Sequence, residues 1–227
     1  MTMLLTDYFR STPDVTWEFA RQCGVEHGTI RLPEDAEFDP ACREHWRSVY
    51  KRFTDHGIRP VVVEPMPNSL HEHIKAGDVM RDECIDKVMK MFAVMDELDV
   101  RTICFNFMAY VGWTRTSREL PERGGAKVTG FRLADYVPGI AHITEAELWN
   151  NYTYFIKAVL PEAEKHGIKL ALHPDDPPIA KLGDVSRIMI SAENMERAVR
   201  TVADSPSLGL TFCQATYYMM GEDLYKV

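Results

Sequence analysis

The chain has 227 residues, 45% of them hydrophobic, and a formal net charge of -8, so it can bury a substantial core as one domain over residues 1–227. An acidic chain lacks the basic face that binds nucleic acids or anionic membrane surfaces, so we expect neither as a partner. No apolar run reaches the roughly 18 residues that cross a bilayer, and no secretory signal opens the chain, so the sequence predicts a cytoplasmic protein.

Strand and helix patterns alternate along the first half of the chain. The first strand is expected over residues 4–9, and Thr12 is expected to cap a helix that Gly24 ends. A strand over 28–32, a helix over 40–56 and a strand over 58–64 follow. Apolar residues at helical spacing then predict a helix near residues 85–95, with Met91 off the apolar stripe.

The second half continues this alternation. After a strand over 102–107, residues 112–139 are rich in glycine, proline and charge and are expected to form a long loop. Thr144 and Glu147 form a capping box for a helix that ends near residue 166. A strand over 168–172, a helix over 192–203 and a strand over 208–213 complete a series of six strands and five intervening helices. Such repeats favour an α/β protein with a parallel sheet, either a barrel or an open doubly wound sheet.

Two of the expected strands end in polar side chains. His173 closes the strand over 168–172 and is followed by Asp175 and Asp176 in a proline-rich loop. Asn106 closes the strand over 102–107 and is followed by Trp113 and Arg115. The carboxyl ends of parallel strands are where α/β enzymes place their chemistry. A histidine that merely caps a buried strand is the alternative interpretation of His173.

These two segments, NFM with WTRT and ALHPDDPP, resemble the corresponding segments of the mannonate dehydratase family. The resemblance extends to residues 62–64, 71–75 and 209–213, in the same order along the chain. It implies a xylose-isomerase-like TIM (β/α)8 barrel of which this chain holds about six of eight strands, apparently truncated at the carboxyl terminus.

The resemblance also implies a divalent metal, Mn2+ or Fe2+, with His173 and Cys213 among its ligands. Ligand type alone points to zinc or iron, since manganese prefers oxygen. Without the resemblance, Cys213 would be interpreted as a plain buried thiol. The family's other metal ligands, a histidine and an aspartate, and its catalytic Asp-His pair have no counterpart before Val227, so the chain by itself is expected to be inactive.

The implied reaction is the elimination of water from D-mannonate, a small-molecule sugar acid, to give 2-dehydro-3-deoxy-D-gluconate. Arg115 is then a candidate clamp for the carboxylate, with Trp113 against the sugar face. Asn106 and Asp175 are candidate partners of hydroxyl groups. Glu64, at the end of the third strand, is a possible acid or base.

His71 is a further possible substrate contact, although its segment follows Pro65 and Pro67 and resembles a loop. A homo-oligomer, expected to be a dimer, would cover strand edges that six strands leave open. Two other functions remain as alternatives at this point: a sugar isomerase or epimerase on the same type of barrel, and a catalytically incomplete fragment.

Overall fold

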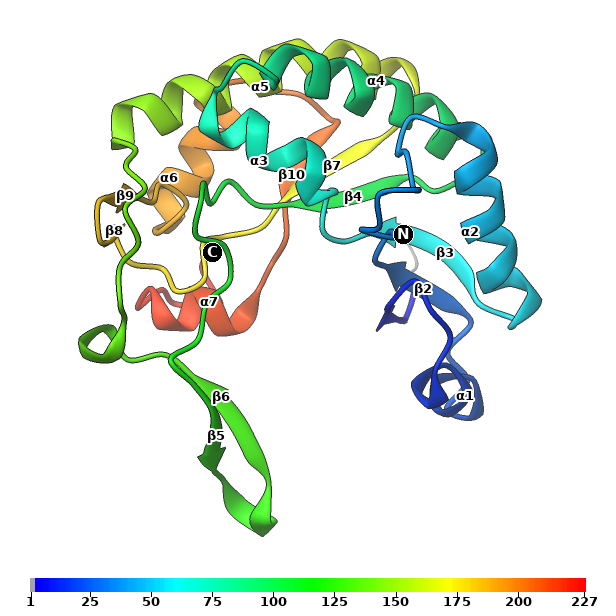
Figure 1. Ribbon diagram of the computed structural model, residues 1–227, viewed down its shortest axis with the longest axis horizontal. Helices are drawn as coiled ribbons and strands as arrows, with labels where there is room; N and C mark the ends of the chain where they lie inside the picture. Colours follow the sequence, from blue (N-terminus) through cyan, green and yellow to red (C-terminus); the bar gives the residue numbers. More distant parts are fainter. Residues whose placement is uncertain (1–2) are drawn as a thin grey trace.

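The centre of the molecule is a sheet of six parallel strands, in the order β1-β2-β3-β4-β7-β10 (Figure 1). The structure is a computed structural model in which residues 3–227 are described. The six predicted strands are therefore confirmed, each shorter than its apolar run. They are β1 (Thr6–Phe9), β2 (His27–Ile30), β3 (Arg59–Val63), β4 (Thr102–Phe105), β7 (Lys169–Leu172) and β10 (Leu208–Leu210).

Helices connect these strands, and α4 and α5 run together along one side of the sheet (Figure 1). The helices are α1 (Val15–Gln22), α2 (Arg43–Asp55), α3 (Asn68–Ala76), α4 (Arg81–Glu97), α5 (Glu145–Lys165), α6 (Ala192–Glu196), which continues as a π-helical turn over Arg197–Thr201, and α7 (Gln214–Met219). Short 3-10 turns lie at Arg123–Gly125 and Leu133–Asp135. No described helix is both long enough and apolar enough to span a membrane.

The capping signals in the sequence are confirmed for α5 and wrong for α1. The Thr144 hydroxyl accepts from the Glu147 amide at 3.2 Å, and the Glu147 carboxylate accepts from the Thr144 amide at 2.8 Å. For α1 the cap is Asp14, whose Oδ1 accepts from the Thr16 amide at 2.8 Å, and not Thr12. Threonine and aspartate both accept a capping hydrogen bond well. The residue type therefore did not decide where α1 begins; the path of the chain did.

Helix α4 is buried on more than one face. Met91 lies off its apolar stripe, yet it is fully buried, because α4 packs against both α3 and α5. The stripe therefore marked only part of the buried surface of the helix. A helix with several packed neighbours buries residues around much of its circumference.

Three predicted loops contain regular structure. Residues 68–76, interpreted as a loop, form α3, which buries Leu70 and Ile74; this prediction was wrong. Within residues 112–139, β5 (Ser117–Pro121) and β6 (Lys127–Gly130) form an antiparallel hairpin that projects from the body of the molecule (Figure 1). The loop after β7 carries a second small hairpin, of β8 (Lys181–Leu182) and β9 (Val185–Ser186).

Candidate active site

The carboxyl ends of all six parallel strands border one cavity of about 530 Å³. Each strand contributes at least one polar side chain to its wall, so residues far apart in the sequence meet there. In strand order these are Tyr8, Arg31, Glu64, Asn106, His173 and Cys213. Four of them, Glu64, Asn106, His173 and Cys213, are predicted site residues; Tyr8 and Arg31 were missed. Parallel strands explain the convergence, because their carboxyl ends lie at the same edge of the sheet.

His173 is held in one tautomer. Its backbone amide donates to Phe105 of β4 at 2.7 Å, and its Nδ1 lies 2.7 Å from the Pro174 carbonyl oxygen. A carbonyl can only accept, so Nδ1 carries the proton and Nε2 keeps a lone pair. A histidine that binds a metal is commonly oriented in this way, through its second nitrogen.

Cys213 lies at the start of α7, with its Sγ 3.1 Å from the Thr216 hydroxyl. It borders the same cavity as His173, which places a nitrogen donor and a sulfur donor on one wall. Within residues 3–227, no group of three or more His, Cys, Asp or Glu side chains is arranged to hold a metal ion. His173 and Cys213 would thus supply two of the three or four donors that a catalytic divalent ion normally has.

A second thiol, Cys104, also lines the cavity, and the sequence analysis did not select it. Its Sγ lies 3.2 Å from the Thr211 hydroxyl. Burial, and then the negative charge of Glu64, raise the pKa of Cys104 to about 12. Cys104 therefore stays a neutral thiol near pH 7, which is the less nucleophilic form.

Arg115 is already paired. Its Nη1 and Nη2 donate to Oδ1 and Oδ2 of Asp176 at 3.0 and 2.7 Å, and its guanidinium lies 4.2 Å from the centre of the Trp113 ring. Both partners of the ion pair are only 14% exposed in their side chains. Trp113 and Asp176 line the cavity, whereas Arg115 stands behind them.

The side-chain amide of Asn106 is oriented so that its NH2 group can donate hydrogen bonds. Its Oδ1 accepts from the Met108 amide at 3.2 Å, which leaves the side-chain NH2 group for a ligand in the cavity. An amide so fixed can donate to a hydroxyl group. The expectation that Asn106 contacts hydroxyls therefore fits its geometry.

Comparison with known proteins decides the family. A model of the D-mannonate dehydratase (UxuA) family matches residues 1–138 and 132–227. The chain belongs to this family. The mannonate dehydratase of Streptococcus agalactiae is 33% identical over 77% of this chain, and the match covers 57% of that relative. The chain thus spans little more than half the length of this relative.

Solved structures support the same fold. The crystal structure of mannonate dehydratase from Streptococcus suis serotype 2 superposes with a TM-score of 0.82 at 27% identity, covering 95% of this chain and 64% of that one. A xylose isomerase-like TIM barrel protein from Mycobacterium smegmatis superposes with a TM-score of 0.54 at 13% identity, covering 89% of this chain and 56% of that one. This second likeness concerns the fold alone. The predicted barrel class is confirmed, with six of its strands in this chain.

Two of the predicted substrate contacts, His71 and Asp175, do not border the cavity. His71 is fully buried in α3, with its ring 5.8 to 5.9 Å from those of Phe105, Phe107 and Phe155. Burial, and then the charge of Lys75, hold the pKa of His71 well below its usual value. His71 is therefore neutral near pH 7, and a direct contact with substrate does not fit this placement.

Asp175 is also fully buried, although an acidic residue in a turn is usually solvated. Its Oδ2 accepts from the amides of Ile188 and Met189, each at 3.1 Å. Burial raises the pKa of Asp175, while the charge of Arg187 opposes that shift. Its role is to join the β7 loop to the segment after β9, whereas its neighbour Asp176 faces the cavity.

Arg187 is a buried brace that no local pattern in the sequence marked. It is 2% exposed, and its Nη2 donates to the carbonyls of Val111 and Gly112, both at 2.9 Å. Its Nη1 lies 3.4 Å from the carbonyl of Pro177. Arg187 thereby ties the loop that carries Trp113 to the loop that carries Asp176.

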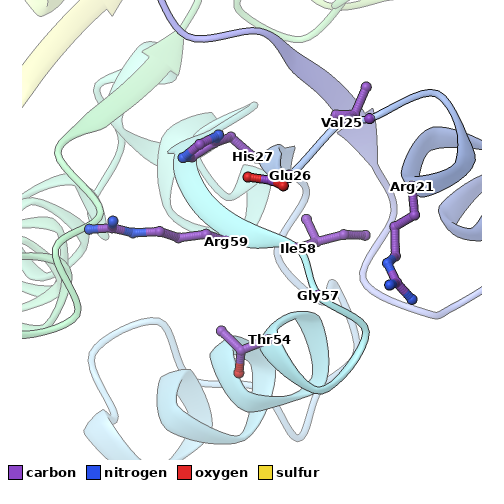
Figure 2. A pocket seen from close by; sticks show the side chains of 9 residues that line it. Arg21, Val25, Glu26, His27, Thr54, Gly57, Ile58 and Arg59 are labelled. Atoms are coloured by element: carbon purple, nitrogen blue, oxygen red, sulfur yellow. The ribbon is translucent and has the colours of Figure 1, made fainter.

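A separate cavity of about 500 Å³ lies at the amino-terminal ends of β2 and β3 (Figure 2). His27 and Arg59 extend to one side of these strands, and Arg21 lies on the other side of Gly57 (Figure 2). None of the predicted site residues lines this cavity. The amino-terminal face of such barrels generally serves stability, so we assign the active site to the opposite face.

Proposed function

We propose that this chain forms the substrate-binding and part of the metal-binding face of a D-mannonate dehydratase, which removes water from D-mannonate to give 2-dehydro-3-deoxy-D-gluconate. The observation that carries this proposal is that His173 and Cys213, the metal ligands implied by the family, border one cavity in a chain that the family model matches throughout.

The proposed metal is Mn2+ or Fe2+, held by the lone pair on His173 Nε2 and by the Cys213 sulfur. When bound, a divalent cation stabilises negative charge that develops beside the substrate carboxylate. The fixed His173 tautomer and the two soft donors suit a transition metal. Further donors, beyond these two, are needed to complete its coordination.

The remaining side chains of the cavity are proposed to orient the sugar acid. Asn106 donates to a hydroxyl group, Trp113 covers one face of the carbon chain, and Asp176, held by Arg115, accepts from another hydroxyl. Glu64 is the one carboxylate of the cavity wall, among the described residues, that is not held by an arginine. We assign it a role in proton transfer.

The test measures both binding and turnover of D-mannonate in the presence of Mn2+. Formation of 2-dehydro-3-deoxy-D-gluconate supports the whole proposal. Binding without turnover supports the substrate and metal assignments and locates the acid-base groups outside residues 1–227. The absence of any D-mannonate binding, with the chain folded by circular dichroism, contradicts the proposal.

We also propose that the protein acts in the cytoplasm as a homodimer. Its five cysteines are all free, as is usual in a reducing compartment. Apolar side chains are exposed on the projecting hairpin, with Leu120 and Val128 paired across it at 43% and 40% exposure. A second copy of the chain could cover them. Light scattering after size-exclusion chromatography measures the mass of the protein in solution, and a dimer would have twice the mass of one chain.

A further inference from the structure

The cavity contains a positive side chain that the family resemblance did not indicate. Arg31, which follows β2 directly, is the one lysine or arginine among the described residues that line the cavity. Its amide donates to the Phe9 carbonyl at 2.9 Å, which anchors its backbone at the carboxyl end of β1. Because the Arg31 backbone is held at this position, its long side chain can extend into the cavity.

The guanidinium of Arg31 is only lightly engaged. Its Nη2 donates to Oε2 of Glu34 at 2.6 Å, and the two side chains are 38% and 45% exposed. This contact uses a single nitrogen of Arg31, and the Tyr8 hydroxyl is the one further group beside the guanidinium that helps to raise its pKa, after Glu34. Exposed pairs of this kind are weak and exchange readily with other ligands. A carboxylate that enters the cavity can therefore bind the remaining N–H groups without breaking a strong interaction.

Arg115 differs on each of these points. Both of its terminal nitrogens are occupied by the two oxygens of Asp176, and Trp113 covers its planar face. A substrate carboxylate would have to displace Asp176 and leave that acid without a partner, which costs more than the new pair gains. The Arg115 charge is thus already neutralised by the protein.

We propose that Arg31 binds the carboxylate of the sugar acid, over the carboxyl ends of β1 and β2, while Asp176, which Arg115 holds, contacts a hydroxyl group on the opposite side of the cavity. This inference rests on the proposed function and deepens it, because it gives the substrate a direction in the cavity. A carboxylate has two oxygens, so one can pair with Arg31 and the other remains available to a metal ion.

The test compares D-mannonate with D-mannonamide, which has the same hydroxyl groups but a neutral amide in place of the carboxylate. Calorimetric titration of the 227-residue chain with Mn2+ present gives both dissociation constants. We expect the unchanged chain to prefer mannonate by about tenfold or more, since a charge-assisted pair is worth that much. Arg31→Met should reduce the preference by weakening mannonate binding alone, leaving only the part that the metal ion contributes, and Arg31→Lys should reduce it less.

The matched control is Arg47→Met. Arg47 also pairs with a glutamate three residues away, Glu44, and is exposed on α2 away from the cavity; its loss should change neither constant. If Arg31→Met does not fold, Glu34→Gln tests the same idea from the other partner, because removal of the competing carboxylate should tighten mannonate binding about twofold or more.

Four results overturn the inference. If Arg31→Met keeps the full preference for mannonate, or if it weakens both ligands equally, Arg31 does not bind the carboxylate, and the proposed function survives. The same conclusion follows if the unchanged chain binds the two ligands equally. If the unchanged chain binds neither ligand, the proposed function fails, and this inference fails with it.

Discussion

The two sides of the cavity are built differently, although each presents an arginine–carboxylate pair. On the side of β4 and β7, the Arg115–Asp176 pair is 14% exposed, and the loops that carry it are joined by the buried residues Asp175 and Arg187. On the side of β1 and β2, the Arg31–Glu34 pair is about 40% exposed and held by one contact. The first side is therefore preorganised, and the second can rearrange around a ligand.

The comparison teaches which residues determine the shape of the site. A braced wall holds its polar groups in place before the ligand arrives, which reduces the entropy that binding must overcome. An exposed pair contributes charge and adapts its geometry at little cost. The predictions below separate these two roles, beginning with the largest expected effect.

Removal of the brace should have the largest effect. Arg187→Met leaves the Val111 and Gly112 carbonyls without their donor and removes the larger of the two positive charges that offset the burial of Asp175, so we expect the free energy of unfolding to fall by about 3–5 kcal/mol. Urea unfolding measures the loss. The control is Arg200→Met, whose pair with Asp204 is about 70% exposed and should matter by less than about 1 kcal/mol. Equal losses in the two variants would show that Arg187 is no brace.

Lys75, buried in α3 beside this brace, should make stability depend on pH. Burial lowers its pKa from 10.5 to about 8. Between these values the unfolded chain binds more protons than the folded chain, so this residue makes the free energy of unfolding rise with pH. Relative to Lys75→Met, the unchanged chain should gain on the order of 3 kcal/mol between pH 8 and pH 10.5. The free energy of unfolding is measured with urea at each pH. If it changes with pH by the same amount in the two proteins, the prediction is wrong.

Metal binding should depend on Cys213, at the start of α7. Cys213→Ala removes one of two donors in the cavity, so we expect the affinity for Mn2+ to fall at least about tenfold, equivalent to about 1.4 kcal/mol. Titration followed by electron paramagnetic resonance of free Mn2+ measures it. Cys23→Ala, at an exposed position after α1, is the control and should leave the affinity unchanged. An unaltered affinity in Cys213→Ala would remove that residue from the metal site.

The two ion pairs should differ from each other in a defined order. Asp176→Asn breaks a bidentate, largely buried pair, and we expect a loss of about 1.5–3 kcal/mol in the free energy of unfolding. Glu34→Gln breaks an exposed contact and should cost less than about 1 kcal/mol. The reverse order in thermal or urea unfolding would mean that the β1–β2 side is the rigid one.

The sequence by itself determined the alternation of strands and helices and four of the six polar side chains that the strand ends contribute to the cavity wall. Asn106 and His173 were found because each closes an apolar strand run, and the ends of parallel strands meet at one edge of a sheet, whereas Cys213 was found through the family resemblance. The capping box at Thr144 depends on contacts three residues apart, so it too could be predicted. Local spacing is sufficient for such features because the interacting groups are close in the chain.

Only the tertiary structure decided which polar residues are buried. Asp175 and Asp176 are neighbours in one proline-rich loop, yet the first is enclosed by the segment after β9 and the second faces the cavity. Arg115 meets Asp176 across 61 residues, and Arg187 reaches carbonyls about 75 residues away. No local pattern encodes these distances. The burial and pairing of a charged side chain depend on which distant elements pack around it, and that arrangement exists only in the folded chain.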